Sequence, residues 1–386
     1  MSVKSIDKEC IASTYNRFDI VAVSGKGSCV FDENGKRYID LGSGIGTLSF
    51  GIADDVWCKA VADQAAKLQH ISNLYYTEPA ALLAKTLCEK TGMKKVFFSN
   101  SGAEANECAI KAARKYSQDK YSSDRFTVAT LKNSFHGRTL TTLAATGQNS
   151  FHELYTPLTE GFISVDAGDL TALKTLAADN KLAAVMIECI QGEGGVIVLD
   201  ADYVKAVAGF CNNNDVLLII DEVQTGNGRT GKLYSYMNYG VTPDIVTTAK
   251  GLGGGLPIGA TILGEKVKDV FAFGDHGSTF GGNPVCCAAA KTVIDRLDGE
   301  LLASVKKKSD YIFSELSDVD GIESVSGIGL MIGIKTKKPA REVVNLCKDR
   351  GVLCLTAKDK VRLLPALNIP DELLKEAIGV IKECVG

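Results

Sequence analysis

Short apolar runs alternate with helical patterns through the middle of this 386-residue chain. The runs are rich in Val, Ile and Phe, and segments with apolar residues at helical spacing, such as 101–116 and 201–214, lie between them. Buried strands that alternate with helices are typical of a parallel sheet, and right-handed crossovers place the helices on both of its faces. We therefore predict a doubly wound α/β fold. The predicted strands are 95–99, 126–130, 162–165, 183–188, 216–221 and 244–249.

The two ends of the chain differ from this middle part. After Pro284 the sequence predicts a mainly helical stretch to about Ser317, then two short strands around the glycines of SVSGIGLMIGI, then an αβα tail. Near the start, VFDENGKRYIDL predicts a hairpin around Asn34-Gly35, but the first fifty residues lack a hydrophobic face large enough to stand alone. We expect them to pack with the small domain formed by the tail. The predicted boundaries are an N-terminal segment at 1–55, a large domain at 56–284 and a small C-terminal domain at 285–386.

Charge and composition exclude several functional classes. The chain has 43 Lys and Arg against 46 Asp and Glu, for a net charge of −3, and no basic stripe, which argues against nucleic-acid binding. No stretch approaches the roughly 18 apolar residues of a membrane span, and the start MSVKSIDKEC lacks the apolar core of a signal peptide. The twelve Cys include no Cys-x-x-Cys pair and the four His have no metal-ligand spacing. We therefore expect a soluble, cytoplasmic protein without a metal site.

Charged side chains follow three of the predicted strands. Asp221 ends VLLIID, Glu188 follows AAVMI, and Lys250 follows DIVTTA directly before the glycine-rich GLGGGLPIGA. Ligands of open α/β sheets bind outside the carboxyl ends of the strands, so together these residues favour a binding site over mere solvated charges. Burial of a lysine lowers its pKa, and a neutral amine can form a Schiff base. With Asp221 holding a heterocyclic nitrogen protonated, Lys250 fits the needs of pyridoxal phosphate.

A phosphate group would need a cradle of backbone N–H groups. The segment SNSGAEANECAIKAA supplies a strand, a turn and a helix N-terminus, where Ser101, Gly102 and Ala103 offer amides to an anion. A plain helix cap explains the same residues equally well, because Ser101 and Glu104 form a capping box. From this segment alone, both interpretations stay open.

Five segments in order carry a family resemblance: SNSGAEANE, SFHGRT, DEVQTGNGRTG, TTAKGLGGGLPIGA and STFGGNP. Together they resemble the fold-type I, class III pyridoxal-phosphate aminotransferases over nearly the whole chain. Within that class, the segments TYNRF, GKGSCVFDENGKRYIDLGSGI, SNLYY and VRLLPALNI are most similar to the acetylornithine aminotransferases. The chain departs from the family's usual Gly-His-x-His-Pro, because it has Phe50-Gly51-Ile52-Ala53-Asp54 there.

The resemblance implies a set of cofactor contacts. Lys250 would bond covalently to pyridoxal 5'-phosphate and move the proton between substrate and cofactor, and Asp221 would pair with the pyridine nitrogen. Thr279 would reach the phosphate from the partner subunit, so the active site would require a homodimer. The other implied contacts are Ser101, Gly102 and Ala103 at the phosphate, Val223 and Phe135 on the two ring faces, and Gln224 at the phenolic oxygen. Taken alone, Phe135 would equally suit a core position.

The resemblance also implies how the substrates are held. Arg138 would bind a substrate carboxylate as a bidentate fork, although by itself it could be an exposed loop arginine. Glu193 would occupy Arg362 while the side-chain amine of the donor reacts, and Arg362 would take the α-carboxylate when 2-oxoglutarate binds. Ser278 would border the substrate. Weaker correspondences, outside the catalytic set, are Tyr15 at the donor pocket and Glu188.

The expected reaction is transamination of N2-acetylornithine with 2-oxoglutarate to N-acetylglutamate 5-semialdehyde and glutamate, within arginine biosynthesis. Sister enzymes acting on succinylornithine, ornithine, 4-aminobutyrate or acylated lysine-pathway donors remain alternatives, because pocket shape separates them and no motif reports it. Gly226-x-Gly228-x-x-Gly231 matches the dinucleotide-binding spacing, but Gly240 and Pro243 interrupt the helix that should follow. The non-enzymatic alternative is a cofactor-binding protein that has lost turnover.

Overall fold

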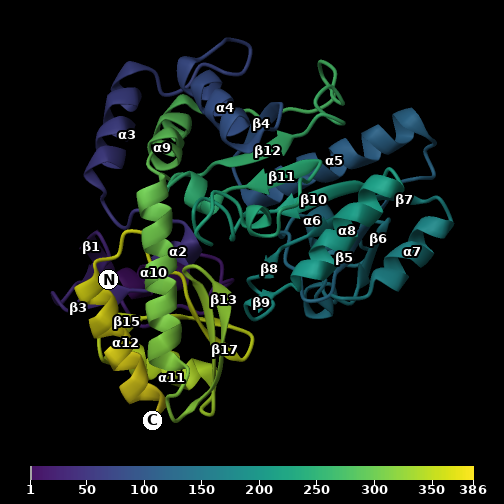
Figure 1. Ribbon diagram of the computed structural model, residues 1–386. Helices are drawn as coiled ribbons and strands as arrows, with labels where there is room; N and C mark the ends of the chain where they lie inside the picture. Colours follow the sequence, from purple (N-terminus) through teal and green to yellow (C-terminus); the bar gives the residue numbers. More distant parts are fainter. Residues whose placement is uncertain (1) are drawn as a thin grey trace.

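The computed structural model describes residues 2–386, and a seven-stranded sheet lies at the centre of its larger part (Figure 1). In spatial order its strands are β4 (Lys95–Ser99), β12 (Gly259–Leu263), β11 (Ile245–Thr248), β10 (Leu217–Asp221), β7 (Leu182–Ile187), β5 (Thr127–Leu131) and β6 (Phe162–Val165). The pairs from β11 to β6 are parallel, whereas β12 is antiparallel to both of its neighbours. All six predicted strands are confirmed, each within one residue at either end.

The sequence prediction missed β12, because it treated the glycine-rich segment before it as a continuous loop. Gly259 begins the strand, and a Cβ there would lie 2.2 Å from the Ser101 carbonyl oxygen. Only glycine therefore allows the chain to pass this close to the end of β4. Since β12 is antiparallel to both β4 and β11, those two strands run in the same direction and end at the same edge of the sheet.

Helices cover both faces of the sheet, as Figure 1 shows and as the double winding predicts. Leu218 and Ile220 of β10 belong to the larger core cluster, with residues of α8, whereas Leu217 and Ile219 pack in a second cluster with residues of α5. This alternation follows the two-residue period of a strand. The helices of this part are α3 (Asp55–Lys67), α4 (Glu78–Thr91), α5 (Gly102–Lys120), α6 (Leu140–Ala145), α7 (Leu170–Ala178) and α8 (Ala201–Asn213).

The two ends of the chain meet in the same lobe (Figure 1). One small sheet joins β1 (Ala22–Lys26), β2 (Cys29–Asp32), β3 (Arg37–Asp40) and β15 (Val352–Leu353), and a second joins β13 (Ile322–Ile328), β14 (Met331–Thr336), β17 (Lys360–Leu363) and β16 (Leu355–Ala357). The helices of the lobe are α1 (Val3–Cys10), α10 (Gly299–Leu316), α11 (Ala340–Asp349) and α12 (Asp371–Val385), and α9 (Pro284–Asp295) packs on α3 and α4. No helix within residues 2–386 is long and apolar enough to cross a membrane.

The structure confirms the predicted hairpin and corrects the predicted tail. Strands β2 and β3 pair antiparallel, with Cys29 opposite Ile39. The tail contains three short strands instead of the single strand of an αβα unit, because β15, β16 and β17 are too short to show an alternating pattern in the sequence. The domain boundaries themselves remain a prediction.

The loop that departs from the family pattern, residues 50–54, has a structural role outside the cavity described below. Asp54 accepts a hydrogen bond from the Trp57 N–H at 2.9 Å, which caps α3, and its carboxylate lies 2.9 Å from Arg296 at the end of α9. Gly51 has φ +78°, and a Cβ there would lie 2.5 Å from the Gly27 carbonyl oxygen. The departure therefore lies where the N-terminal strands contact α3 and α9.

Candidate active site

The carboxyl ends of β4, β10 and β11 open into one cavity of about 480 Å³. Most of the predicted site residues line it: Ser101, Gly102, Ala103, Phe135, Arg138, Glu193, Asp221, Val223, Gln224 and Lys250, together with Glu188. Arg362 contacts two of these lining residues from β17. Residues from five predicted strands or loops therefore meet in one place, as the convergence of strand ends at one sheet edge requires.

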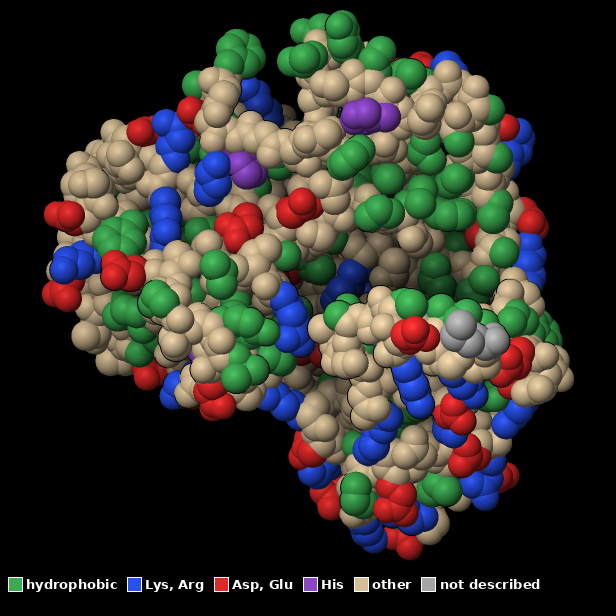
Figure 2. All heavy atoms as spheres, turned by 180° about the vertical axis from the view of Figure 1, so that it is seen from behind, with side chains coloured by type: hydrophobic (Ala, Val, Ile, Leu, Met, Phe, Trp, Pro, Cys, Tyr) green, Lys and Arg blue, Asp and Glu red, His purple; other side chains and the backbone are tan. Residues whose placement is uncertain are grey.

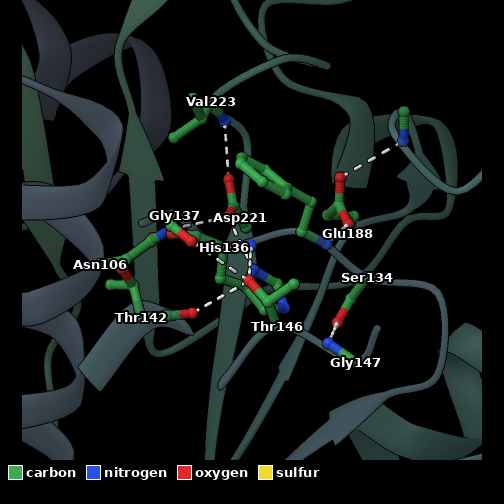
Figure 3. Close-up of polar contacts among 12 residues, drawn as sticks. Asn106, Ser134, His136, Gly137, Thr142, Thr146, Gly147, Glu188, Asp221 and Val223 are labelled. Atoms are coloured by element: carbon green, nitrogen blue, oxygen red, sulfur yellow. Dashed lines mark hydrogen bonds and ion pairs between the residues drawn. The ribbon is translucent and has the colours of Figure 1, made fainter. Parts of the chain in front are cut away.

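Asp221 is fixed by three donors. As the last residue of β10 it points to the α5 side of the sheet, where its Oδ2 accepts hydrogen bonds from Asn106 Nδ2 and His136 Nδ1, both at 2.8 Å (Figure 3). Its Oδ1 accepts from the Val223 N–H at 2.9 Å. Asp221 is 3% exposed, so the orientation of its carboxylate toward the cavity is set by the protein and not by solvent.

His136 forms a buried hydrogen bond with this carboxylate. Burial alone would lower the pKa of His136, but the hydrogen bond and the negative charge of Asp221 raise it above the ordinary value. The His136 carbonyl accepts a second bond from Asn106 Nδ2, at 2.7 Å. Asp221 therefore favours the protonated form of the buried imidazole, and Asn106 holds the two residues together.

Glu188 is a second buried carboxyl group in the cavity wall. Its Oε2 accepts from the Phe135 N–H at 2.9 Å and its Oε1 from the Gly192 N–H at 3.3 Å. Burial raises the pKa of Glu188 to about 7, partly opposed by the nearby His136. Glu188 thus joins the segment that carries Phe135 to the loop that carries Glu193.

Lys250 lies two residues after the end of β11, at the first residue of the short 3-10 helix η3 (Lys250–Leu252). Its φ of +43° is unusual for a side chain other than glycine, and such strain is concentrated at functional sites. Burial lowers the pKa of the Lys250 amine, Glu193 opposes this shift and Arg362 adds to it. Among residues 2–386, no group forms a hydrogen bond or ion pair with Nζ, which leaves it free to react.

Glu193, Gln224 and Arg362 form a closed set of contacts. Arg362 Nη1 lies 2.6 Å from Glu193 Oε1 and 3.0 Å from Gln224 Oε1, and Gln224 Nε2 donates to Glu193 Oε1 at 3.1 Å. Burial would raise the pKa of Glu193, but the charge of Arg362 and its hydrogen bond lower it below the ordinary value. The structure therefore brings together the two residues that the family resemblance pairs.

The first turn of α5 offers unpaired N–H groups to the cavity. Ser101 Oγ accepts from the Glu104 N–H at 3.2 Å, so Ser101 does cap the helix. The N–H groups of Gly102 and Ala103 have no carbonyl within the helix to bond. The cap and the cradle interpretations are therefore compatible, because the hydroxyl serves the cap and the amides stay available.

The space in front of this turn depends on two glycines. A Cβ at Gly102 would lie 2.6 Å from Val223 Cγ1, and a Cβ at Gly137, which has φ +139°, would lie 2.8 Å from Ala103 Cβ. Together with the free lysine amine, the fixed carboxylate and the amides of α5, this opening fits a phosphorylated pyridine aldehyde. The donor set of the cavity therefore suits pyridoxal phosphate.

Besides Arg362, which reaches the cavity only through Glu193 and Gln224, three predicted residues do not line it. Ser278 accepts a hydrogen bond from Asn100 Nδ2 at 3.1 Å, next to the cradle. Thr279 is exposed, and Tyr15 is 73% exposed. Neither contributes to the cavity formed by the residues of a single described chain.

The sequence analysis missed Asn106, His136 and Thr47, which also line the cavity. Asn106 carried a signal, because it is a polar side chain among the small apolar residues of the buried face of α5. The glycines at 226–231 form turns followed by the 3-10 helix η2 (Ser235–Asn238), not the long helix of a dinucleotide-binding unit.

Comparison with known proteins finds matches over nearly the full length of the chain. The family described as aminotransferase class-III matches residues 10–385. The chain is 51% identical over 383 residues to the acetylornithine aminotransferase of Haemophilus ducreyi, covering 99% of this chain and 98% of that one. The N-acetylornithine aminotransferase structure from Stenotrophomonas maltophilia K279a has a TM-score of 0.85 at 34% identity, covering 97% of each chain.

An ornithine aminotransferase structure from Toxoplasma gondii, described as having partial occupancy of PLP at the active site, has a TM-score of 0.93 at 32% identity. The match covers 99% of this chain and 93% of the Toxoplasma gondii chain. The family matches nearly the whole chain, the Haemophilus ducreyi enzyme shares half of the residues, and the solved structures share the fold. This chain therefore belongs to the class III aminotransferase family.

Proposed function

We propose that this protein is a pyridoxal-phosphate-dependent transaminase that moves the side-chain amino group of N2-acetylornithine to 2-oxoglutarate. The products are N-acetylglutamate 5-semialdehyde and glutamate, which is a step of arginine biosynthesis. The observation that carries this proposal is the contact between Arg362 and Glu193, 2.6 Å apart beside Lys250, because it lets one cavity treat two unlike substrates differently. The full-length relatives named as acetylornithine aminotransferases support the choice of donor.

Lys250 and Asp221 would carry the chemistry. When bound, pyridoxal phosphate supplies an aldehyde for the donor amine and a ring that withdraws electrons. Lys250 Nζ, whose pKa is lowered by burial, would hold the cofactor between turnovers and take the proton from the carbon that bears the donor amine. Asp221, fixed by Asn106 and His136, presents an oriented carboxylate to the protonated ring nitrogen. Gly102 and Ala103 direct their N–H groups to the phosphate.

Arg362 and Arg138 would hold the substrates. While the donor amine reacts, Glu193 occupies Arg362, so that arginine is not available to an α-carboxylate. When 2-oxoglutarate enters, its α-carboxylate replaces Glu193 at Arg362 as a charge-assisted, bidentate partner. Arg138 binds the carboxylate at the far end of either substrate.

A donor panel tests the proposal. The protein loaded with pyridoxal phosphate should lose the visible absorption band of its lysine-bound cofactor on addition of N2-acetylornithine, and 2-oxoglutarate should restore it. Ornithine, 4-aminobutyrate and succinylornithine serve as comparison donors. Preference for one of them would overturn the proposed donor, whereas absence of the band after loading would overturn the roles of Lys250 and Asp221.

The active unit would be a homodimer. Two loops near the cavity, 70–76 and 273–283, are linked by Asn73 Nδ2, which donates to the Ser278 and Gly281 carbonyls at 3.0 and 2.8 Å. They carry exposed hydrophobic side chains, and Figure 2 shows such side chains projecting from the upper rim of the molecule. The exposed residues are Leu74, Tyr75, Tyr76, Phe273 and Phe280. A second copy of the chain would bury this surface and bring Thr279 to the phosphate of its partner.

Mixing two inactive variants tests whether the site is shared. Lys250→Ala lacks its own lysine, and Thr279→Ala would lack a phosphate contact in its partner. A mixed dimer would contain one intact site, made of Lys250 from one chain and Thr279 from the other. Co-expression should therefore restore activity and cofactor binding to part of the dimers. Lack of restoration in a mixed dimer isolated with two tags would place Thr279 in the site of its own chain or outside any site.

The remaining assignments are also proposals. Cysteine usage supports a reducing, cytoplasmic location, because twelve free cysteines are typical of such compartments. The division at residues 55 and 284 is supported by the pairing of β3 with β15, which joins the two ends of the chain in one lobe. Limited proteolysis should cut between the lobes near these positions.

A further inference from the structure

Arg138 lies over two aromatic rings at the wall of the cavity. Its Cζ is 4.5 Å from the centroid of the Phe151 ring and 5.7 Å from that of the Phe135 ring. The two rings meet edge to face, with centroids 5.9 Å apart and an interplanar angle of 71°. The guanidinium is exposed, and within residues 2–386 no carboxylate, carbonyl or hydroxyl bonds to it.

Arg114 differs in this respect, although it also lies over two rings. Its Cζ is 5.6 Å from the Phe126 ring and 5.1 Å from the Phe162 ring. Arg114 additionally donates to the Glu160 carbonyl at 2.6 Å and to the Phe126 carbonyl at 3.3 Å, and these bonds fix its orientation. Arg138 has no such bonds, so the rings alone hold its guanidinium.

Phe151 is itself fixed to the segment that carries Arg138. It ends the 3-10 helix η1 (Asn149–Phe151), and its N–H donates to the Gln148 carbonyl at 3.0 Å. Gln148 Nε2 donates in turn to the Ser134 carbonyl at 3.1 Å, directly before Phe135. The Phe151 ring therefore keeps its place relative to the cavity without help from a ligand.

We propose that Phe151 is a positioning residue, whose ring holds the Arg138 fork toward the cavity so that the site selects substrates with a carboxylate at the end remote from the reacting carbon. A ring face attracts the cation but accepts none of its in-plane N–H groups, so the edge of the guanidinium stays available for a bidentate carboxylate. This proposal deepens the proposed function and rests on it, because it assumes that Arg138 meets the far carboxylate of the substrate.

A double-mutant cycle tests the proposal in the cofactor-loaded enzyme. The variants are Phe151→Leu, Arg138→Gln and their combination, with Phe151→Tyr as the conservative variant and Phe126→Leu as the matched control beneath Arg114. Each is assayed with N2-acetylornithine and with N-acetyl-1,4-diaminobutane, which has the same amine end but no carboxylate. A weakly desolvated cation–π contact predicts that Phe151→Leu raises the KM for N2-acetylornithine about two- to fivefold, at unchanged kcat.

The same substitution should not change kcat/KM for N-acetyl-1,4-diaminobutane, and should have no further effect in the Arg138→Gln background. Phe151→Tyr should restore the wild-type KM, and Phe126→Leu should leave both donors unaffected. An equal loss with both donors, or a loss that persists without Arg138, would show that Phe151 only shapes the pocket. A wild-type KM in Phe151→Leu would also overturn the proposal.

Failure of the proposed donor is distinguishable from failure of this inference. If the wild type does not use N2-acetylornithine, the proposed donor is wrong. The double-mutant cycle is then measured on the acceptor half-reaction instead. There, 2-oxoglutarate carries the far carboxylate and 2-oxobutyrate lacks it. A rise in KM confined to 2-oxoglutarate and dependent on Arg138 supports the role of Phe151, and equal behaviour of the two acceptors refutes it.

Discussion

Arg362 Nη1 and Glu193 Oε1 lie 2.6 Å apart, and Gln224 bonds to both groups. The arginine side chain is 3% exposed and the glutamate side chain 29%, so the movable partner is the acid. A buried cation paired with a partly exposed carboxylate can exchange that carboxylate for one of a ligand without becoming unpaired. In the proposed function, this contact would act as a reversible cover over a carboxylate-binding site.

Replacing Glu193 by Gln should open this cover permanently. The uncharged amide competes less well for Arg362, so the KM for 2-oxoglutarate should fall by about fivefold, as a loss of about 1 kcal/mol of competition predicts. Glutamate should also become a better donor relative to N2-acetylornithine. Steady-state kinetics of both half-reactions measure these changes. Asp63→Asn, which removes an acid from the exposed Lys59–Asp63 pair, is the matched control and should change neither constant.

Replacing Lys250 by Ala should abolish turnover, because the variant loses both the amine that holds the cofactor and the group that moves the proton. The loss in kcat should be on the order of a thousandfold or more. Borohydride reduction makes a lysine–aldehyde linkage permanent, so mass spectrometry should find the cofactor on the Lys250 peptide of the wild type only. Labelling of a different lysine in the wild type would contradict the assignment.

Glu188 should make stability fall as the pH rises through neutrality. Its pKa is raised to about 7 in the folded protein from a value of 4.5 in the unfolded chain, so the folded state binds the extra proton between these values. This contribution is fully present below about pH 4.5 and is lost as the pH rises through 7, with a total of up to about 3 kcal/mol. Glu188→Gln should flatten the dependence of the unfolding free energy on pH between roughly 5 and 8, where proton binding by Glu188 is coupled to folding.

Denaturant titrations at several pH values measure the Glu188 effect. Glu9→Gln removes an exposed acid of α1 and should leave the pH dependence of the unfolding free energy unchanged. Glu188→Gln should also lower stability at low pH, where the wild type keeps its full contribution, because an amide cannot accept from both the Phe135 and the Gly192 N–H groups. Parallel curves for the variant and the wild type would show that Glu188 does not titrate in this window.

Gly102→Ala should weaken cofactor binding more than it affects folding. The new Cβ would lie 2.6 Å from Val223 Cγ1, which must move within the cavity wall. Gly209→Ala in α8 is the matched control, because nothing lies within 4 Å of its Cβ. That control should raise the free energy of unfolding by about 0.5–1 kcal/mol through helix propensity. Titration with pyridoxal phosphate, followed by absorbance, should show weaker cofactor binding by Gly102→Ala than by Gly209→Ala.

The sequence predicted the strands and the two central residues of the site because both leave local signals. Asp221 and Lys250 each follow an apolar run directly, and the end of such a run marks the edge of the sheet where ligands bind. The place of Asp221 on the α5 side follows from the two-residue period of β10. These inferences need only neighbouring residues.

What the sequence could not reveal depends on distant contacts. Glu193 and Arg362 are 169 positions apart and meet because β17 pairs with β14 in a register that places Gly333 opposite Arg362. Without the family resemblance, nothing in either local sequence pairs them. His136 was hidden for a similar reason, because its partner Asp221 is 85 positions away. Strand β12 was missed since its first residue is one of many glycines.

The pairing of β3 with β15 sets an order of events during synthesis. Lys36 Nζ donates to the Asp349 carbonyl across 313 positions, so the partner of the first sheet emerges from the ribosome long after the sheet itself. At about 5–20 residues per second, the delay is roughly 15–60 s. Throughout this interval the edge of β3 lacks its partner strand, and its backbone groups are open to pairing with other strands.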